Sequence, residues 1–143
     1  MIVDLLTIKD TGLIGTIGEL IARLYLHSEH IGAFQFRSDS EFKYSFLNKK
    51  QTNYLKDLAE HGPNWCWDFI GIGHAGKDTY LIEVKTSRPR KRKHGLKSRW
   101  TEGARRGYSP EELEKAKLLG FKLLLVNVQL IENWKFEVTS REL

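Results

Sequence analysis

The sequence of 143 residues predicts an α/β protein in which helices flank a central mixed sheet. Three observations support this fold class. An amphipathic helical pattern opens the chain, two apolar runs joined by a short turn occupy its middle, and a well-capped helix followed by a long apolar run comes near its end. Hydrophobic residues make up 41% of the chain, which is enough for the core of one domain. Because helices packed on a sheet would bury these apolar surfaces, we expect a single domain over residues 1–143.

The first predicted helix runs from Thr11 to about His30, and Asp10 or Thr11 suits its N-cap. Three glycines recur every third residue in this helix, although each costs about 1 kcal/mol relative to alanine. We therefore expect them to allow close approach of a neighbouring segment. The apolar residues at helical spacing, which predict one buried stripe, are Leu13, Ile14, Ile17, Leu20, Ile21 and Leu24.

The middle of the chain predicts a β-hairpin from Trp65 to Thr86. Two runs of large apolar and β-branched residues flank a segment of turn composition. A turn symmetric about Gly76 and Lys77 would place Asp68 opposite Lys85. Before this hairpin, residues 33–36 predict a short strand and residues 48–60 a polar helix. Trp65 and Trp67 are expected mainly in the core.

The third predicted helix has a strong start signal. Ser109 suits the N-cap position, and Pro110 suits the first position of the helix. Two acids, Glu111 and Glu112, lie in the first turn, and Gly120 follows the end of the helix. Residues 121–130 then predict a buried strand. A last strand over residues 135–139 follows a turn near Asn133.

Composition excludes several classes of protein. The single Cys66 forms no internal disulfide and provides no pair of cysteines for structural zinc. No apolar run approaches the ~20 residues that a membrane span needs. The first residues, with an acid at Asp4, do not have the pattern of a signal peptide. We therefore expect a cytoplasmic protein without a membrane segment.

Positive charge is concentrated in one part of the chain. Residues 85–106 contain ten lysines and arginines against Glu102 alone, a net charge of +9 in a chain of net charge +5. The remaining residues therefore carry −4. A local cationic segment is typical of a phosphate-rich partner such as nucleic acid, and the alternative is a solvated loop without a partner. The cations expected to contact nucleic acid are Arg88, Arg90, Lys91, Arg92, Lys93, Lys97, Arg99, Arg105 and Arg106.

Three charged residues of the predicted hairpin suggest chemistry. Alternation along a strand puts Glu83 and Lys85 on one face, and the symmetric turn would place Asp68 on that face, diagonal to Glu83. Ionisable groups on apolar strands are costly to bury unless they bind a metal or pair with each other. Carboxylate and carbonyl oxygens suit Mg²⁺ or Mn²⁺, and Lys85 could orient the attacking water or stabilise the phosphate. An internal salt bridge of Lys85 with Glu83 or Asp68 is the competing interpretation.

The order of these residues and elements resembles the PD-(D/E)xK nuclease superfamily, in particular its restriction-endonuclease-like and archaeal Holliday-junction-resolvase-like members. The resemblance spans about residues 12–128, although Trp67 stands where the motif has proline. It implies an αβββαβ core in which Asp68, Glu83 and the Val84 carbonyl bind the metal and Lys85 is the catalytic lysine. It also implies that Glu19, on the first helix, is a further metal or water ligand; an ordinary exposed helix acid is the alternative.

The expected activity is metal-dependent cleavage of DNA. Junctions and other branched structures are candidate substrates, and the sequence does not distinguish DNA from RNA. The basic segment, residues 88–107, would be flexible without DNA, and Trp100 within it could stack on a base or fold back onto the protein. Because cleavage of a junction needs two sites, we expect a homodimer. The alternatives are a nucleic-acid-binding module that does not cut and a basic protein that binds acidic proteins.

Overall fold

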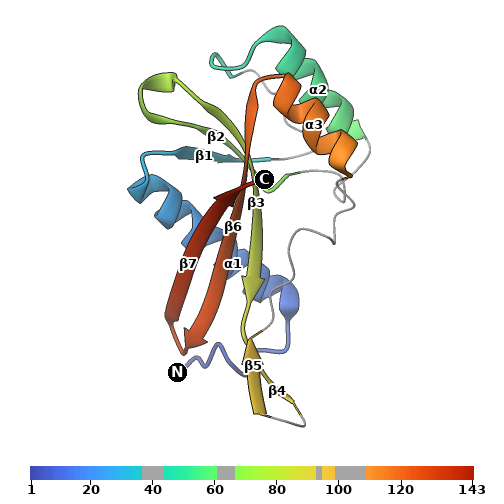
Figure 1. Cartoon of the computed structure of the whole chain (residues 1–143). Helices are drawn as coiled ribbons and strands as arrows, with labels where there is room; N and C mark the ends of the chain where they lie inside the picture. The colour runs from blue at the N-terminus through green and yellow to red at the C-terminus, as the bar shows by residue number, and fades with distance from the viewer. Residues whose placement is uncertain (37–43, 61–66, 93–94, 99–108) are drawn as a thin grey trace.

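The computed structural model of the protein is built around a five-stranded mixed sheet flanked by helices (Figure 1). It describes residues 1–36, 44–60, 67–92, 95–98 and 109–143. The main elements, in chain order, are α1 (Thr11–Ser28), β1 (Gly32–Gln35), α2 (Lys49–Glu60), β2 (Phe69–Ile72), β3 (Thr79–Ser87), β4 (Pro89–Arg92), β5 (Gly95–Ser98), α3 (Pro110–Leu118), β6 (Phe121–Glu132) and β7 (Lys135–Glu142). The predicted α/β class and the predicted helices and strands are thus confirmed.

The sheet has the strand order β1-β2-β3-β6-β7. The central strands β3 and β6 are parallel, in register from Thr79 opposite Phe121 to Ser87 opposite Gln129. The other neighbouring strands of this sheet are antiparallel. A separate two-stranded ribbon, β4 and β5, lies beyond the end of β3 (Figure 1). The basic segment therefore begins where β3 ends.

Helix α1 begins where the sequence predicts. The Asp10 side chain accepts a hydrogen bond from the Leu13 N–H at 3.1 Å and caps the helix. Ala22 and Leu26 pack against the face of the sheet formed by residues such as Ile82 and Val126. One layer of helix therefore covers this face.

The predicted buried stripe of α1 is correct for Ile14, Ile17 and Ile21, which are buried or half-buried, and wrong for its three leucines. The buried residues are Ile14, Gly18, Ala22 and Leu26, whereas Leu13, Leu20 and Leu24 are 47%, 59% and 62% exposed. The physical reason is that small side chains let the helix approach the sheet. A Cβ atom on Gly18 would overlap Oγ1 of Thr86 on β3 and lie 2.7 Å from its Cγ2. The expectation that a glycine allows close approach is confirmed at Gly18.

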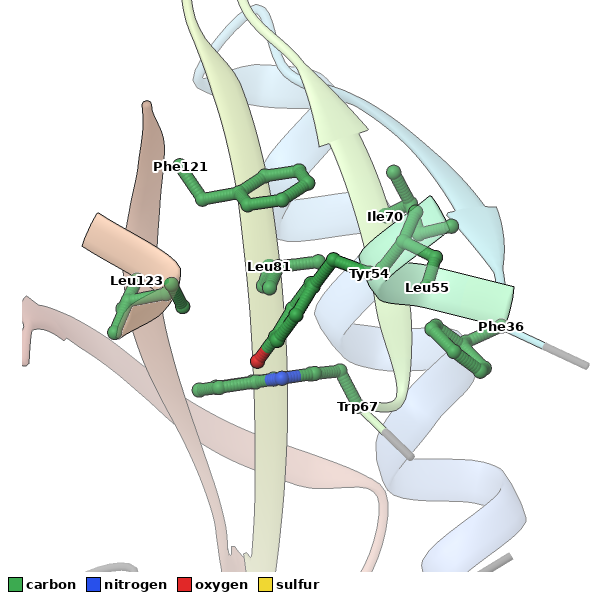
Figure 2. Packing of buried hydrophobic residues seen from close by; sticks show 9 residues of the cluster. Phe36, Tyr54, Leu55, Trp67, Ile70, Leu81, Phe121 and Leu123 are labelled. Carbon is green, nitrogen blue, oxygen red and sulfur yellow. The ribbon is translucent and has the colours of Figure 1, made fainter. Parts of the chain in front are cut away.

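The opposite face of the sheet packs against α2 and α3. Figure 2 shows the cluster, in which Tyr54 and Leu55 of α2 meet Ile70, Leu81 and other sheet residues. The Gln51 amide donates to the carbonyl of Leu119 at 3.1 Å and joins α2 to the end of α3. These contacts fix both helices over one end of the sheet.

Tyr54 and Trp67 lie together in this cluster, with the Tyr54 hydroxyl directed toward the indole (Figure 2). Burial raises the pKa of Tyr54, the Trp67 side chain lowers it, and the charge of Glu112 raises it further. Trp67 is 2% exposed, so its predicted place in the core is confirmed. Trp65 lies outside the described residues.

The hairpin of β2 and β3 forms, but its predicted register is wrong. Phe69 stands opposite Ile82, so Lys85 has no partner on β2. The turn closes earlier than a symmetric turn about Gly76 and Lys77 would, because Ala75 and Gly76 adopt positive φ angles of 58° and 69°. Asp68 consequently lies near Ile82 and Val84 and not opposite Lys85.

Helix α3 carries the predicted N-terminal cap. The Glu112 N–H donates to Ser109 Oγ at 3.2 Å, and the Ser109 N–H donates to the Glu112 carboxylate at 3.4 Å. None of the helices in the described part of the chain has the length and apolar character that crossing a membrane requires.

Of the basic segment, β4 and β5 are described as strands. Residues 93–94 and 99–107, with Lys93, Arg99, Arg105, Arg106 and Trp100, lie outside the described residues. The flexibility of this segment stays a prediction.

Candidate active site

Asp68 lies at the entry to β2, against the open edge of β3. Its Oδ2 atom accepts a hydrogen bond of 2.7 Å from the Val84 N–H. The Asp68 N–H donates to the Ile82 carbonyl at 3.0 Å, and the next residue, Phe69, stands opposite Ile82. Two consecutive residues thus face one residue of β3, as at a β-bulge, and such a step changes the direction of a side chain. The Asp68 carboxylate is therefore held beside the peptide group that joins Glu83 to Val84.

A cavity of about 240 Å³ opens between α1 and this edge of β3. Asp68 and Val84 line it on the strand side, and Glu19 lines it on the helix side. The other lining residues are Thr11, Ile14, Gly15, Thr86 and Arg88. The structure thus brings together three of the predicted metal ligands, Asp68, Glu19 and Val84, around one cavity.

Helix α1 positions Glu19 through its packing on β3. Gly18, the preceding residue, contacts Thr86, so the helix backbone lies close to the strand at this point. Glu19 is half-buried and faces the cavity, which is a boundary position and not the fully exposed surface of the helix. The packing of a glycine on the sheet therefore carries the acid to the strand edge.

Glu83 and Lys85 leave β3 on the other face of the sheet. Leu81, two residues before Glu83, packs with α2 and α3, whereas Val84 packs with α1, as strand alternation requires. Lys85 Nζ lies 3.0 Å from Glu83 Oε1, and the two side chains are 17% and 2% exposed. Neither Glu83 nor Lys85 lines the cavity.

Arg88 connects the cavity with the basic segment. It lines the cavity, directly follows β3, and its guanidinium donates to the Leu5 carbonyl at 3.1 Å. Leu5 is in turn held by a 2.9 Å hydrogen bond from its N–H to Asn133 Oδ1 at the β6–β7 turn. The first cation of the segment is therefore fixed at the mouth of the candidate site.

The residues around the cavity match the ligand preferences of a small divalent cation. Two carboxylates, from Glu19 and Asp68, and the backbone carbonyl group of Val84 provide hard oxygen donors, and Mg²⁺ usually takes one or two carboxylates together with water and substrate phosphate. Within the described ranges, no three His, Cys, Asp or Glu side chains form a group that could hold a metal ion. The acids that line the cavity are Glu19 and Asp68.

Comparisons of the chain with protein-family models, curated proteins and solved structures found no match.

Two further polar residues lie near Lys85, and sequence reasoning missed one of them, Asn127. Asn127 of β6 stands next to Lys85 in the parallel register, and Ser87 follows Lys85 on the same face of β3. The signal for Asn127 was present, because it is a polar residue within an otherwise apolar strand. The sequence allows Ser87 either to donate a hydrogen bond to a phosphate or to be an ordinary polar residue at a strand end.

Proposed function

We propose that the protein is a metal-dependent endonuclease of PD-(D/E)xK type that hydrolyses phosphodiester bonds of DNA. The observation that carries this proposal is the position of Asp68. Its carboxylate is hydrogen-bonded at 2.7 Å to the peptide group between Glu83 and Val84, and it shares a cavity with Glu19. Residues far apart in the sequence, with the ligand chemistry of a Mg²⁺ site, thus converge on the strand that carries Lys85.

The fold supports the proposal in its order of elements. Helix α1, strands β1, β2 and β3, helix α3 and strand β6 follow the αβββαβ order that the resemblance implies, with α2 inserted after β1 and the β4–β5 ribbon after β3. These four strands are also neighbours in that order in the sheet. We therefore include in the proposal that the protein has a restriction-endonuclease-like fold.

In this proposal Glu19, Asp68 and the Val84 carbonyl group would hold Mg²⁺ or Mn²⁺. Glu83 does not line the cavity, so its side chain would have to turn past the open edge of β3 to become a further ligand. A divalent cation in such a site activates water and polarises a phosphate oxygen. Lys85 stabilises the negative charge that develops on the phosphate. Arg88 and the basic segment hold the nucleic-acid backbone beside the cavity, because phosphate contacts position a nucleic acid without selecting its sequence.

Branched DNA is the proposed substrate class, and a homodimer is the proposed assembly because two strands must be cut.

A cleavage assay tests the proposal. Labelled duplex, single-stranded, flap and four-way-junction DNA are incubated with the protein in Mg²⁺, Mn²⁺ or EDTA, with matched RNA as a further substrate. We expect metal-dependent cleavage that Asp68→Asn, Glu83→Gln and Lys85→Met abolish while DNA binding is kept. Glu132→Gln, a change at an acid 67% exposed on the β6–β7 turn, is the matched control and keeps full activity.

A nucleic-acid-binding module that does not cut is the second candidate. The ion pair of 3.0 Å between Lys85 and Glu83 favours it, because two such residues could serve only to neutralise each other. DNA binding without cleavage of any substrate in either metal would support this candidate and exclude the nuclease.

A further inference from the structure

The surroundings of Lys85 contain more hydrogen-bond acceptors than its ion pair uses. Lys85 Nζ has three N–H donors, and one contact, of 3.0 Å, goes to Glu83 Oε1. Asn127 stands beside Lys85 on the neighbouring parallel strand, and Ser87 lies two residues farther along β3 on the same face. Glu83 and Ser87 on β3 and Asn127 on β6 thus all carry acceptor atoms on the face of the sheet that carries Lys85.

Two of these acceptors are buried without a partner. Asn127 Oδ1 and Ser87 Oγ have no hydrogen-bond partner within the described part of the chain, and Ser87 is 7% exposed. A buried polar atom without a hydrogen bond costs about 1–3 kcal/mol, so most such atoms in folded proteins are paired. An atom kept unpaired beside a charged donor calls for a functional explanation.

We propose that Asn127 is a positioning residue for Lys85. Its amide oxygen accepts a hydrogen bond from the Lys85 ammonium when the Glu83 carboxylate is engaged elsewhere. This inference rests on the nuclease function proposed above. There the Glu83 carboxylate turns to a ligand role, and the Lys85 ammonium loses part of its 3.0 Å contact with Glu83. Asn127 Oδ1 then accepts a hydrogen bond from Nζ and keeps the ammonium on its face of the sheet, with Ser87 Oγ as a second acceptor.

Asn127 is the better placed of the two acceptors. Lys85 and Asn127 are Cα partners on adjacent strands, so their side chains leave the sheet side by side. Asn127 is also opposite Thr139 on β7, which makes it part of the rigid centre of the sheet. A side chain fixed on both sides by strands can define the place of a long, flexible lysine.

A kinetic experiment tests this role. Asn127→Leu removes the acceptor at nearly constant volume, and we expect kcat to fall at least about tenfold, with the Kd for DNA unchanged, because one hydrogen bond to a charged group is lost. Asn127→Asp keeps an oxygen there and retains most of kcat. Gln129→Leu, two residues farther along the same face, is the control and leaves kcat unchanged. Full kcat in Asn127→Leu, or a loss in Gln129→Leu equal to that in Asn127→Leu, would overturn the inference.

A stability experiment tests the same contact without metal, DNA or cleavage. In a Glu83→Gln background the charge that holds Lys85 is absent, so Lys85 is expected to bond Asn127. The melting temperatures of Lys85→Met, Asn127→Leu and the double variant should then be non-additive by about 3 °C, and additive when Glu83 is present. Additive shifts in the Glu83→Gln background would overturn the inference. A wild-type protein that cleaves nothing would instead overturn the nuclease, and the stability cycle would still decide the role of Asn127.

Discussion

Replacement of Gly18 by alanine tests the packing that brings α1, and with it Glu19, to the edge of β3. A Cβ atom at this position would overlap Oγ1 of Thr86 and lie 2.7 Å and 2.8 Å from its Cγ2 and Cβ. These distances are shorter than van der Waals contacts, so either the helix or Thr86 must move. Extra atoms in a packed interface cost about 1–3 kcal/mol.

Gly15 provides a matched control on the same helix. No atom lies within 4 Å of the position that a Cβ atom would take at Gly15. Gly15→Ala should therefore show only the helix propensity of alanine, a gain of about 1 kcal/mol in the free energy of unfolding. The same gain is present in Gly18→Ala, but the overlap with Thr86 exceeds it. We expect Gly18→Ala to lower stability by about 1–2 kcal/mol.

Urea unfolding followed by far-UV circular dichroism measures both changes. The two substitutions should move the unfolding midpoint in opposite directions, with a difference of about 2–3 kcal/mol between them. Gly18→Ala,Thr86→Ser, which removes one of the overlapping atoms, should recover part of the loss. A Gly18→Ala protein as stable as Gly15→Ala would refute the close contact between α1 and β3.

Three further predictions concern the core and the caps. Leu26 is fully buried between α1 and the sheet, so Leu26→Ala should lower the free energy of unfolding by about 2–5 kcal/mol. Leu24, on the same helix, is 62% exposed, so Leu24→Ala should change it by no more than about 0.5 kcal/mol. Equal losses would contradict the orientation of α1. Ser109→Ala should cost about 1 kcal/mol in chemical denaturation through loss of the α3 cap, and no loss would contradict the capping box. Because burial raises the pKa of Tyr54 above its ordinary 10.0, the free energy of unfolding should fall as the pH rises above about 10. Tyr54→Phe should reduce this fall when unfolding is measured at alkaline pH. The same pH dependence in Tyr54→Phe as in the wild type would contradict the buried hydroxyl.

The elements of the fold were predictable because their signals are local. The α3 helix begins at Ser109 because its hydroxyl and the Glu112 side chain bond each other's backbone N–H groups, and this pattern is visible in four consecutive residues. The Asp10 cap of α1 is equally local. Apolar runs bounded by turn residues likewise defined β3 and β6.

The relations between elements were harder to predict because they depend on atoms that the sequence pattern does not display. The hairpin register depends on Ala75 adopting a positive φ of 58°, which alanine rarely does and composition does not reveal. The buried side of α1 depends on Gly18 and Ala22, small residues that a search for large apolar residues passes over. A sequence with leucines on two sides of a helix does not reveal which side meets the sheet.

Three of the five predicted members of the candidate site line one cavity, whereas Glu83 and Lys85 do not. Glu19, Asp68 and Val84 line one cavity, although they come from three separate parts of the sequence. The prediction that Asp68 lies opposite Lys85 failed because the turn closes earlier than predicted, so that Phe69 pairs with Ile82 and not with Val84. The role of Asn127 could not be recognised before the parallel register of β3 and β6 placed it beside Lys85.

The most direct test of the proposed nuclease is the cleavage of a labelled four-way DNA junction by the purified protein in Mg²⁺ or Mn²⁺, compared with Asp68→Asn and with EDTA. We expect cleavage by the wild-type protein in metal, none in EDTA, and none by Asp68→Asn although it binds the junction as tightly. Cleavage by Asp68→Asn at the wild-type rate, or binding without cleavage by the wild-type protein on junction, flap, duplex and single-stranded DNA alike, would contradict the proposed function.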